Sequence, residues 1–494
     1  MANRVIPAAS KLLKTLRPLN SAASSTTISA ISPPIGYAEK PLQSPSGHAI
    51  TAADTITDNI FNLDDVDKLF ASVSTPTLLR ASLNLHAVAF EPLVDMGMWV
   101  MKSRLMDTPL IRDVIMGIIR YTFYEHFCAG ENAVAAGRSV LELNEAGLRG
   151  MLVYALEYAG DNDACDRNLQ GFLDTVEATK SLPPSSVSFI IMKITAICPM
   201  RVLERVSDLL RWQHKDPSFK LPWKLDTLPI FSDNSPLYHT LEKPEPLTPD
   251  EERDLELVHQ RLLKLSQKCS EANVPLSVDA EYSSVQPAID YLTYSSAIIY
   301  NKDDNPIVYG TIQAYLKDAK ERLLLATKAA DDMGIPMGFK VVRGAYMSSE
   351  AKVASSLGYK SPIHDSIEDT HACYNDCASF MLEKIANGSG GVVLASHNVE
   401  SGKLAVAKAH EIGIGKVRQK LEFAQLYGMA ESLSFGLRNA GFQVSKYMPF
   451  GPIELVLPYL LRRAEENRGL LTASTPDRQR TREVLKRRLK AAIF

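Results

Sequence analysis

Apolar and polar positions alternate in two patterns between about residues 147 and 470. Eight short, apolar runs have the length of buried strands, and several of the longer stretches between them carry apolar residues at helical spacing. Alternation of strand and helix predicts a parallel sheet, and eight units predict a closed (β/α)8 barrel. An open doubly wound sheet is the alternative, but no GxGxxG sequence follows any run. The runs are 148–156, 188–195, 275–280, 306–313, 338–343, 391–396, 420–423 and 442–447.

Three segments lie outside this repeat. Residues 36–146 are mostly helical in pattern and are expected to form a helical arm. Residues 199–250 hold seven prolines from Pro217 onward and are interpreted as a surface insertion between the second strand and its helix. Residues 471–494 form a basic tail, with seven Lys or Arg against two acidic residues from position 477 onward. This tail is predicted to be a solvated helix or, alternatively, a contact for anionic lipid.

Residues 1–35 have the composition of a targeting segment. They contain four basic residues and no acidic one, the first acidic residue being Glu39, and Ser and Thr crowd positions 21–32. A basic, acid-free, Ser-rich and amphipathic N-terminus is typical of an organelle transit peptide, and the apolar core of a secretory signal is missing. Composition does not separate mitochondria from plastids. A basic tail without a targeting role is the alternative.

The overall composition excludes several classes of protein. Hydrophobic residues make up 46% and charged residues 22% of the 494 residues, which is ordinary for a globular protein and excludes wholesale disorder. The net charge of −3 argues against a nucleic-acid binder. Six cysteines are scattered without a CxxC pair. His371, Cys373 and Cys377 lack a second pair of ligands, so no metal site is expected.

Polar side chains interrupt or end several of the apolar runs. Lys193 follows a fully apolar stretch, where an uncompensated charge is costly, so an anion is expected to face it. Barrel enzymes carry their functional residues at the carboxyl ends of the strands, and we expect the site there. The other polar residues at such ends are Asp279, Glu281, Gln313, Lys340, Arg343, Ser396, His397 and Asn398.

A row of polar residues lies on the helix expected over residues 452–468. Two adjacent guanidiniums suit a carboxylate, because each offers a planar fork of donors. The row therefore predicts recognition of an amino acid or another small acid, with Glu157 as a partner for one arginine. A solvated charged face is the alternative. The residues of this row are three or four positions apart and therefore share one face of the helix; they are Tyr459, Arg462, Arg463 and Glu466.

Several of these segments resemble the proline dehydrogenase family over about residues 147–470. Together with the N-terminal segment, the resemblance points to the plant mitochondrial type. It implies a distorted (β/α)8 barrel that binds FAD noncovalently, with the eighth helix over the barrel mouth. It also implies oxidation of L-proline to Δ1-pyrroline-5-carboxylate by hydride transfer to flavin N5. The matching segments are 279–281 (DAE), 312–315 (IQAY), 340–346 (KVVRGAY), 396–398 (SHN), 423–429 (FAQLYGM) and 459–467 (YLLRRAEEN).

The resemblance implies roles around the substrate. Lys193, Arg462 and Arg463 are implied to hold the carboxylate of proline. Glu157 is implied to pair with Arg462 as a gate, and Asp279 to support the polar network around Lys193. The residues implied to enclose the proline ring are Tyr447, Tyr459 and Leu426, with Tyr346 nearby.

The resemblance also implies a surface for FAD. Gln313 and Lys340 are implied to face the isoalloxazine edge. An ideal strand points Lys340 and Arg343 to opposite faces, so both reach the cofactor only if the chain bends near Gly344. The residues implied to contact the rest of FAD are Arg343, Gly344, Ala345, Thr370, Ser396, His397, Asn398 and Glu466.

Two other functions stay open from the residues alone. One is an aldolase that forms a Schiff base on Lys193. The other is a membrane-associated scaffold without enzymatic activity, with residues 477–494 as its lipid contact. The resemblance implies instead a mitochondrial matrix enzyme that passes electrons from L-proline to a membrane quinone. Peripheral contact with the anionic inner membrane is expected through the basic tail, and the net charge argues against a nucleic-acid partner.

Overall fold

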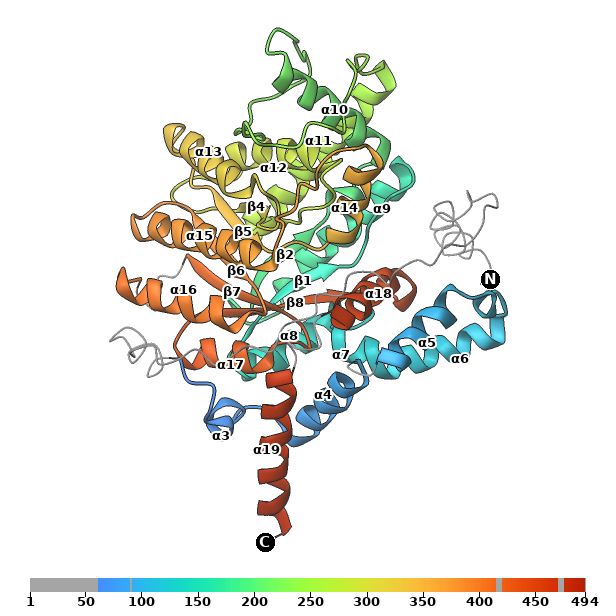
Figure 1. Ribbon diagram of the computed structural model, residues 1–494, viewed down its shortest axis with the longest axis vertical. Helices are drawn as coiled ribbons and strands as arrows, with labels where there is room; N and C mark the ends of the chain where they lie inside the picture. The colour runs from blue at the N-terminus through green and yellow to red at the C-terminus, as the bar shows by residue number, and fades with distance from the viewer. Residues whose placement is uncertain (1–60, 89–90, 415–419, 470–474, 494) are drawn as a thin grey trace. The chain divides into compact units, whose positions relative to one another are not determined.

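The computed structural model describes residues 61–88, 91–414, 420–469 and 475–493. The expected targeting segment, residues 1–35, lies outside this part. Eight parallel strands form a closed barrel in which each strand pairs with the next and β8 pairs with β1 (Figure 1). Each strand overlaps one of the eight apolar runs, so the predicted barrel is confirmed. The strands are β1 (Arg149–Tyr154), β2 (Val187–Met192), β3 (Leu276–Val278), β4 (Val308–Gln313), β5 (Gly338–Val342), β6 (Gly391–Ala395), β7 (Leu421–Leu426) and β8 (Val444–Phe450).

The strands are apolar on both faces because both faces are covered. Alternate residues such as Leu152 and Ile190 belong to the main core outside the barrel. The residues between them form a second cluster inside it, and this double burial explains why the runs show no polar alternation. The inner cluster consists of Met151, Val153, Phe189, Ile191, Tyr309, Val393 and Ala424.

Helices surround the barrel, and several begin at a capping side chain. Thr248 and Glu251 form a capping box at the start of α11. Asn398 caps α16 by accepting a hydrogen bond from the backbone N–H of Ser401, which fixes the first turn of α16 beside the end of β6. The helices of this layer are α9 (Asn162–Thr179), α11 (Pro249–Ala272), α12 (Gln286–Tyr300), α13 (Ala319–Asp332), α14 (Met347–Ser356), α15 (Ile367–Ala386), α16 (Val399–Glu411) and α17 (Glu431–Asn439).

The segment 199–250 differs from the expected surface insertion. It begins with α10 (Met200–Lys215), which packs against α12 and buries Val206 and Leu210 in the main core. The interpretation as a surface excursion is therefore wrong for the first third of the segment. The apolar spacing of an amphipathic helix was present, but the prolines that follow obscured it.

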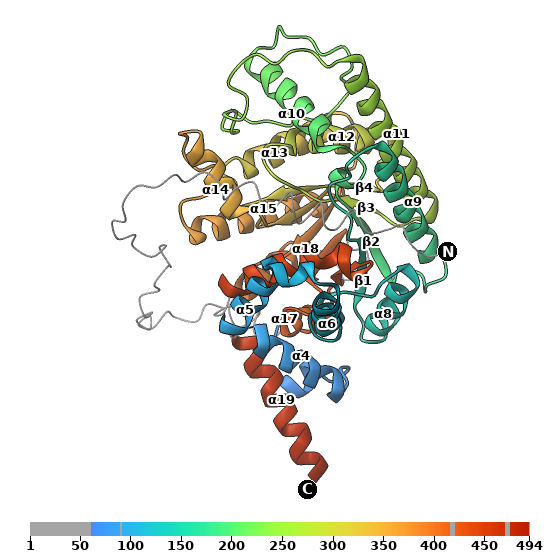
Figure 2. The same ribbon diagram turned by 90° about the vertical axis from the view of Figure 1, so that its right-hand side faces the viewer.

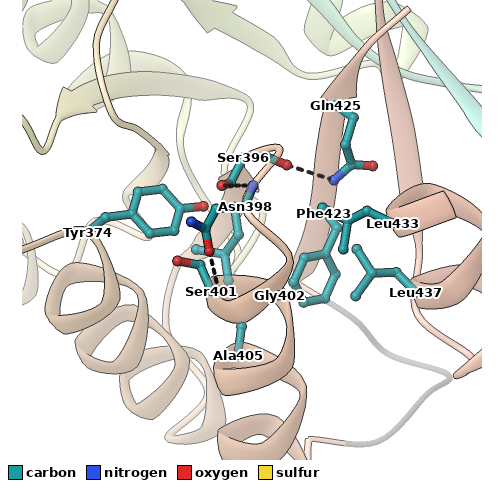
Figure 3. Close-up of a pocket in the computed structure, with 11 residues that line it drawn as sticks. Tyr374, Ser396, Asn398, Ser401, Gly402, Ala405, Phe423, Gln425, Leu433 and Leu437 are labelled. Carbon is teal, nitrogen blue, oxygen red and sulfur yellow. Dashed lines mark hydrogen bonds between the residues drawn. The ribbon is translucent and has the colours of Figure 1, made fainter. Parts of the chain in front are cut away.

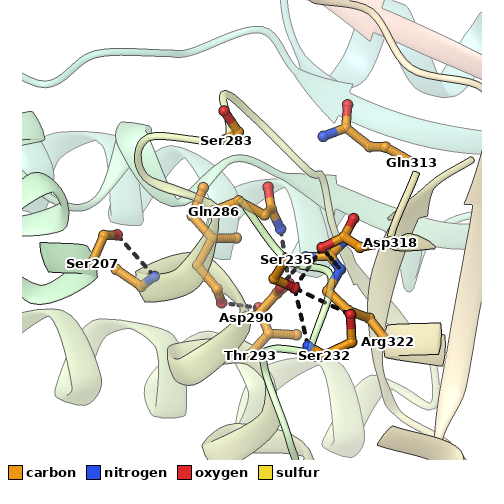
Figure 4. A network of polar contacts seen from close by, with 12 residues as sticks. Ser207, Ser232, Ser235, Ser283, Gln286, Asp290, Thr293, Gln313, Asp318 and Arg322 are labelled. Carbon is orange, nitrogen blue, oxygen red and sulfur yellow. Dashed lines mark hydrogen bonds and ion pairs between the residues drawn. The ribbon is translucent and has the colours of Figure 1, made fainter. Parts of the chain in front are cut away.

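A buried polar network ties the rest of this segment to the barrel helices (Figure 4). Ser235 donates a 2.6 Å hydrogen bond to Asp318, which precedes α13. The guanidinium of Arg322 lies 3.4 Å from Asp318 and 3.3 Å from Asp290. Gln286 donates to Asp290 and accepts from the backbone N–H of Glu281, so the network reaches the segment after β3.

All the secondary-structure elements of the arm's described part are helices or helical turns, joined by short loops. Its first residues, Phe61 and Leu63, are buried against α17, where a Cβ at Gly436 would lie 2.4 Å from Leu63. A larger residue at position 436 would force the side chain of Leu63 to shift. The elements of the arm are α3 (Val66–Leu69), α4 (Thr75–Val88), α5 (Glu91–Lys102), η2 (Arg104–Asp107), α6 (Pro109–Ile119), η3 (Arg120–Tyr124), α7 (Glu125–Phe127) and α8 (Ala133–Glu145).

The C-terminal helix α19 (Thr475–Ile493) packs against α3 and α4 (Figures 1 and 2). Arg488 donates hydrogen bonds of 2.7 and 2.6 Å to the carbonyls of Phe70 and Val73. Val484 and Leu485 are buried in the main core. The tail is thus docked on the arm, which differs from the expected solvated helix.

Helix α18 (Ile453–Gly469) follows β8 and covers the carboxyl ends of the strands. The hydroxyl of Tyr124 in η3 donates a 2.7 Å hydrogen bond to the carbonyl of Gly451, just before this helix. Further along α18, Arg462 contacts Glu157, which follows β1. Helix α18 therefore has the place over the barrel mouth that was expected of the eighth helix of the barrel. No helix in the described ranges is long and apolar enough to cross a membrane.

Candidate active site

Lys193 and Arg462 converge on the carboxylate of Glu157. Glu157 follows β1, Lys193 follows β2 and Arg462 lies on α18, so three elements meet here. Arg462 donates two hydrogen bonds, of 2.7 and 3.2 Å, to the two oxygens of Glu157. Nζ of Lys193 lies 3.6 Å from Oε1 of Glu157 and donates a 2.8 Å hydrogen bond to the Tyr346 hydroxyl. The anion expected to face Lys193 is thus a carboxylate of the chain itself.

Burial and neighbouring charges fix the protonation of this group. Burial raises the pKa of Glu157, but Lys193 and Arg462 outweigh it and bring the pKa down to about 2. Burial lowers the pKa of Lys193, but Tyr346, Glu157 and Glu281 together raise it well above its usual value. Glu157 is therefore ionised and Lys193 protonated at neutral pH.

We expect the free energy of unfolding of the Glu157→Gln variant to depend less on pH in the acid range than that of the wild type. The pKa of Glu157 is about 2 in the folded chain against 4.5 ordinarily, so its stabilisation is complete above pH 4.5 and disappears as the pH falls toward 2. The wild type should lose on the order of 3 kcal/mol more than the variant over this window. Unfolding free energies measured between these pH values test this, and parallel profiles would contradict it.

Asp279 pairs with Lys340 and Tyr447 rather than with Lys193. Nζ of Lys340 donates to Oδ1 of Asp279, and the Tyr447 hydroxyl donates a 2.8 Å hydrogen bond to Oδ2. Residues of alternate strands share a layer inside such barrels, which brings the end of β3 to β5. The expected support for Lys193 is therefore not direct. Burial and Asp279 raise the pKa of Tyr447 well above its usual value, so the phenol keeps its proton.

The inner face of α18 is buried, not solvated. Arg463 is buried, and its guanidinium lies 5.1 Å from the ring centroid of Tyr459, one turn earlier. The side chain of Glu466 lies outside the described residues. Tyr459 belongs to an apolar cluster against which Leu426 and Tyr447 pack; its other members are Tyr124, Phe127, Cys128, Met429, Ile453, Val456 and Leu460.

Arg343 follows β5 and is held from two further elements. Its guanidinium donates to Nδ1 of His371 at 3.1 Å, to Oγ of Ser396 at 2.5 Å and to Oγ of Ser401 at 2.8 Å. Ser396 and Ser401 flank Asn398, the cap of the 13-residue helix α16. A guanidinium beside the free backbone N–H groups of a helix N-terminus is suited to a phosphate.

Sequence reasoning missed three partners of this arginine, namely His371, Tyr374 and Ser401. The ring of Tyr374 lies 4.3 Å below the guanidinium. His371 and Tyr374 are three residues apart on α15, beside the expected Thr370, whose hydroxyl lies 3.4 Å from the Ser366 carbonyl. That spacing indicated that the two side chains share one helical face. Their contact with Arg343, however, depends on how α15 packs on β5 and β6.

The chain bends where β5 ends. Gly344 has a φ of +135°, and a Cβ there would lie 2.5 Å from the ring of Tyr315. Lys340 thereby points to Asp279 inside the barrel, and Arg343 points to α16. Ala345, the next residue, is exposed.

Gln313 and Glu281 are buried in the mouth, and His397 beside them is half-buried. Nε2 of Gln313 donates a 3.0 Å hydrogen bond to the carbonyl of Glu281, and Nε2 of His397 accepts one of 3.1 Å from the N–H of Leu426. Burial, with nearby cationic groups, lowers the pKa of His397 to about 3, so its ring is neutral. The carboxyl of Glu281 accepts from both the N–H and the hydroxyl of Thr195, which fixes the turn after Lys193.

A small cavity lies beside the first turn of α16 (Figure 3). Gln425 lines it and donates a 3.3 Å hydrogen bond to the carbonyl of Ser396. Polar side chains, among them Ser401 and Asn398, form one wall, and Phe423 and Leu433 form another. The cavity therefore belongs to the surroundings of Arg343 and not to the carboxylate contacts of Glu157.

Proline utilization A proteins are among the solved structures that share this fold. The protein of Bdellovibrio bacteriovorus, inactivated by N-propargylglycine, matches with a TM-score of 0.58 at 19% identity, over 90% of this chain and 42% of that one. A second such protein, with proline bound in remote sites, gives a TM-score of 0.53 at 19% identity, over 86% and 44%. The chain thus spans less than half of their length. The closed barrel with ionisable groups at its strand ends defines a (β/α)8-barrel enzyme.

Residues 137–474 match the family model for proline dehydrogenase. The chain therefore belongs to the proline dehydrogenase family and is an oxidoreductase. It is 60% identical over 433 residues to mitochondrial proline dehydrogenase 2 of Arabidopsis thaliana, covering 87% of this chain and 91% of that relative. It is 59% identical over 435 residues to proline dehydrogenase 1 of the same plant, covering 87% of each. Human hydroxyproline dehydrogenase is 32% identical over 431 residues.

Proposed function

We propose that the chain oxidises L-proline to Δ1-pyrroline-5-carboxylate with FAD as its cofactor. The contact of Lys193 and Arg462 with one carboxylate carries this proposal. It shows that a cation following β2 and a guanidinium on α18 can bind the same carboxylate. The carboxylate of a small amino acid suits the same donors. The two Arabidopsis relatives, named mitochondrial proline dehydrogenases, support proline as the substrate and mitochondria as the location.

Proline is held by its carboxylate and enclosed by aromatic rings. Lys193, Arg462 and Arg463 bind the carboxylate, which fixes the orientation of the ring. Tyr447 and Tyr459 line the ring with Leu426, and they pack in one cluster under α18. Arg462 keeps its contact with Glu157 as a gate, so that α18 closes the mouth and excludes water.

The groups around Arg343 fit a flavin dinucleotide. The guanidinium beside the N-terminus of α16 suits the pyrophosphate, and Gly344 leaves the backbone open at the bend. Lys340 and Gln313 lie at the mouth, where a cation favours a reduced, anionic flavin. When bound, FAD supplies a two-electron acceptor at its N5 atom.

The protein residues orient the substrate but do not take its proton. Lys193 stays protonated because its pKa is raised by Tyr346 and Glu157 despite burial, so it anchors the carboxylate and is no base. The amine of proline is neutral when it reacts, its extra proton having passed to solvent before α18 closes. Loss of a hydride from the adjacent ring carbon and of the N–H proton then forms the C=N bond of the product.

An anaerobic titration tests this proposal. The purified protein should show a flavin spectrum that bleaches on addition of L-proline, and trans-4-hydroxy-L-proline serves as the comparison substrate. A Schiff-base aldolase needs a neutral Lys193, which the raised pKa opposes. A colourless protein, or borohydride trapping of substrate on Lys193, would overturn the proposal.

We further propose that the electrons pass to a membrane quinone and that the enzyme is a peripheral protein of the anionic inner membrane facing the matrix. Membership of the family supports this acceptor. Steady-state oxidation of proline with a soluble quinone analogue tests the proposal. An enzyme reoxidised only by oxygen or a nicotinamide would contradict it.

Gln313→Ala should weaken flavin retention or shift the flavin potential. The change removes a buried amide at the end of β4 and leaves the Glu281 carbonyl without its donor. Flavin content after gel filtration and a redox titration measure the two effects. Gln260→Ala is the matched control, because this exposed amide donates to Glu256 on α11. Normal retention together with a normal potential would remove the assignment.

A further inference from the structure

The arm carries an apolar face that no described element covers. On α6 and the following η3 turn, Leu110, Val114, Ile118 and Tyr121 are spaced by four, four and three residues and share one side. Leu110, Ile118 and Tyr121 are 76%, 60% and 73% exposed. The preceding helix α5, which lies beside α6 in both views (Figures 1 and 2), carries two further exposed apolar residues, Met96 and a 64% exposed Trp99. These six residues are called the arm face.

The other side of α6 is already packed, so the arm face is a second apolar surface on the same helix. Met116 and Ile119 pack on the cluster that contains Tyr459 and Leu460 of α18. No residue of α6 is fully buried, although the helix is apolar nearly all round. Such a helix belongs in a core or against lipid. Single exposed apolar residues are normal, but a contiguous set marks a contact surface.

We propose that the arm face rests in the interfacial layer of a lipid bilayer. The inference rests on the proposed function, because a quinone acceptor dissolves in that bilayer. Trp99 and Tyr121 each join an apolar ring to a polar group, the type of side chain that prefers the boundary between lipid and water. No helix in the described ranges spans a membrane, so the contact is one of helices lying in the plane of the surface.

The charged residues around the arm face are paired with residues of opposite charge. The attraction to lipid should therefore come from burial of the apolar side chains and not from charge. Arg112 lies 3.6 Å from Asp113, and Arg120 lies 2.6 Å from Glu131. The contact should therefore need no anionic lipid and should persist at high salt. A contact through the basic α19 would behave in the opposite way.

The position of the arm face suits electron transfer to a lipid-soluble acceptor. Helix α18, which covers the barrel mouth, contacts both α5 and η3. An arm seated on the bilayer thus brings the helix over the substrate site next to the lipid. The distance that a quinone has to travel outside the bilayer is correspondingly short.

Co-sedimentation of the full-length holoenzyme with phosphatidylcholine vesicles tests the proposal. The double variant V114E/I118E should lower the bound fraction by about tenfold or more, because it places two charges in the apolar layer. The matched control L324E/L404E changes two exposed leucines of α13 and α16 and should bind like the wild type. Salt at about 0.5 M and the tail variant K486Q/K490Q should leave binding unchanged.

Three results would overturn the proposal. They are absence of vesicle binding by the wild type, equal loss in both glutamate variants, and binding that needs cardiolipin and disappears with salt or K486Q/K490Q. A dimer that V114E/I118E dissociates in sedimentation velocity, without vesicle binding, would assign the face to a second copy of the chain. Proline oxidation with a water-soluble dye is measured on the same samples and should be unchanged in V114E/I118E. A wild type inactive with the dye would refute the proposed function instead.

Discussion

Replacing Arg463 with methionine should raise KM for L-proline roughly tenfold to 150-fold while the flavin stays bound. A hydrogen bond to a charged group contributes about 1.5–3 kcal/mol, which corresponds to that range. Arg463 is buried, and its guanidinium lies over the ring of Tyr459 on the helix that covers the mouth. Methionine retains much of the buried aliphatic part of the arginine side chain, so α18 should keep its place while the charged contact with the carboxylate is lost.

Steady-state kinetics with L-proline and the flavin absorbance of the same sample measure this effect. Arg482→Met is the matched control, since this exposed arginine of α19 contacts His86 of the arm at 2.8 Å. Its KM should equal that of the wild type. An unchanged KM in the Arg463 variant would refute the role in substrate binding, and release of flavin would assign Arg463 to the cofactor.

Replacing Arg322 with methionine should lower the free energy of unfolding by about 3–5 kcal/mol. The guanidinium stands between Asp290 and Asp318, and all three side chains are buried. Its removal leaves two buried carboxyl groups close together without a cation. Burial already raises the pKa of Asp290 to about 6, with Arg322 opposing the rise, and the variant should raise it further.

The pH dependence of this loss identifies its cause. A carboxyl group whose pKa is higher in the folded chain than in the unfolded one destabilises the fold increasingly as the pH rises above the unfolded value. The loss in the Arg322 variant should therefore be larger at about pH 7.5 than at about pH 5. Lys320→Met is the control on the same helix, α13. It removes an exposed ion pair with Asp376 and should lower the free energy of unfolding by about 1 kcal/mol or less. Urea unfolding of both variants distinguishes these results, and equal losses would contradict the explanation.

The barrel was predictable because its strands are buried on both sides. A run such as 188–195 is apolar without alternation, and a helical pattern follows most of these runs, which only a parallel sheet satisfies. The ends of some strands differ from the ends of the apolar runs by two or three residues, as in β7 and β8. Helix α10 was missed because the proline-rich stretch after it dominated the interpretation of 199–250.

Site residues were predictable where the spacing within one helix or strand places them together. Contacts between residues of two different elements were mostly not predictable. The row of Arg462 and Arg463 follows from helical spacing, and the pairing with Glu157 is present in the structure. The partners of Asp279 depend on how strands stagger around the barrel, which no local pattern encodes. The contact of His371 with Arg343 likewise depends on the packing of α15.

The burial of Phe61 and Leu63 beneath α17 limits how the chain can be matured. A peptidase that trimmed the front of the chain would have to cut before Phe61 to keep these contacts, since a later cut would leave an empty space against Gly436. The same two residues begin the stretch that leads to α3 and its contacts with α19. Trimming at the front of the chain would therefore loosen its far end as well.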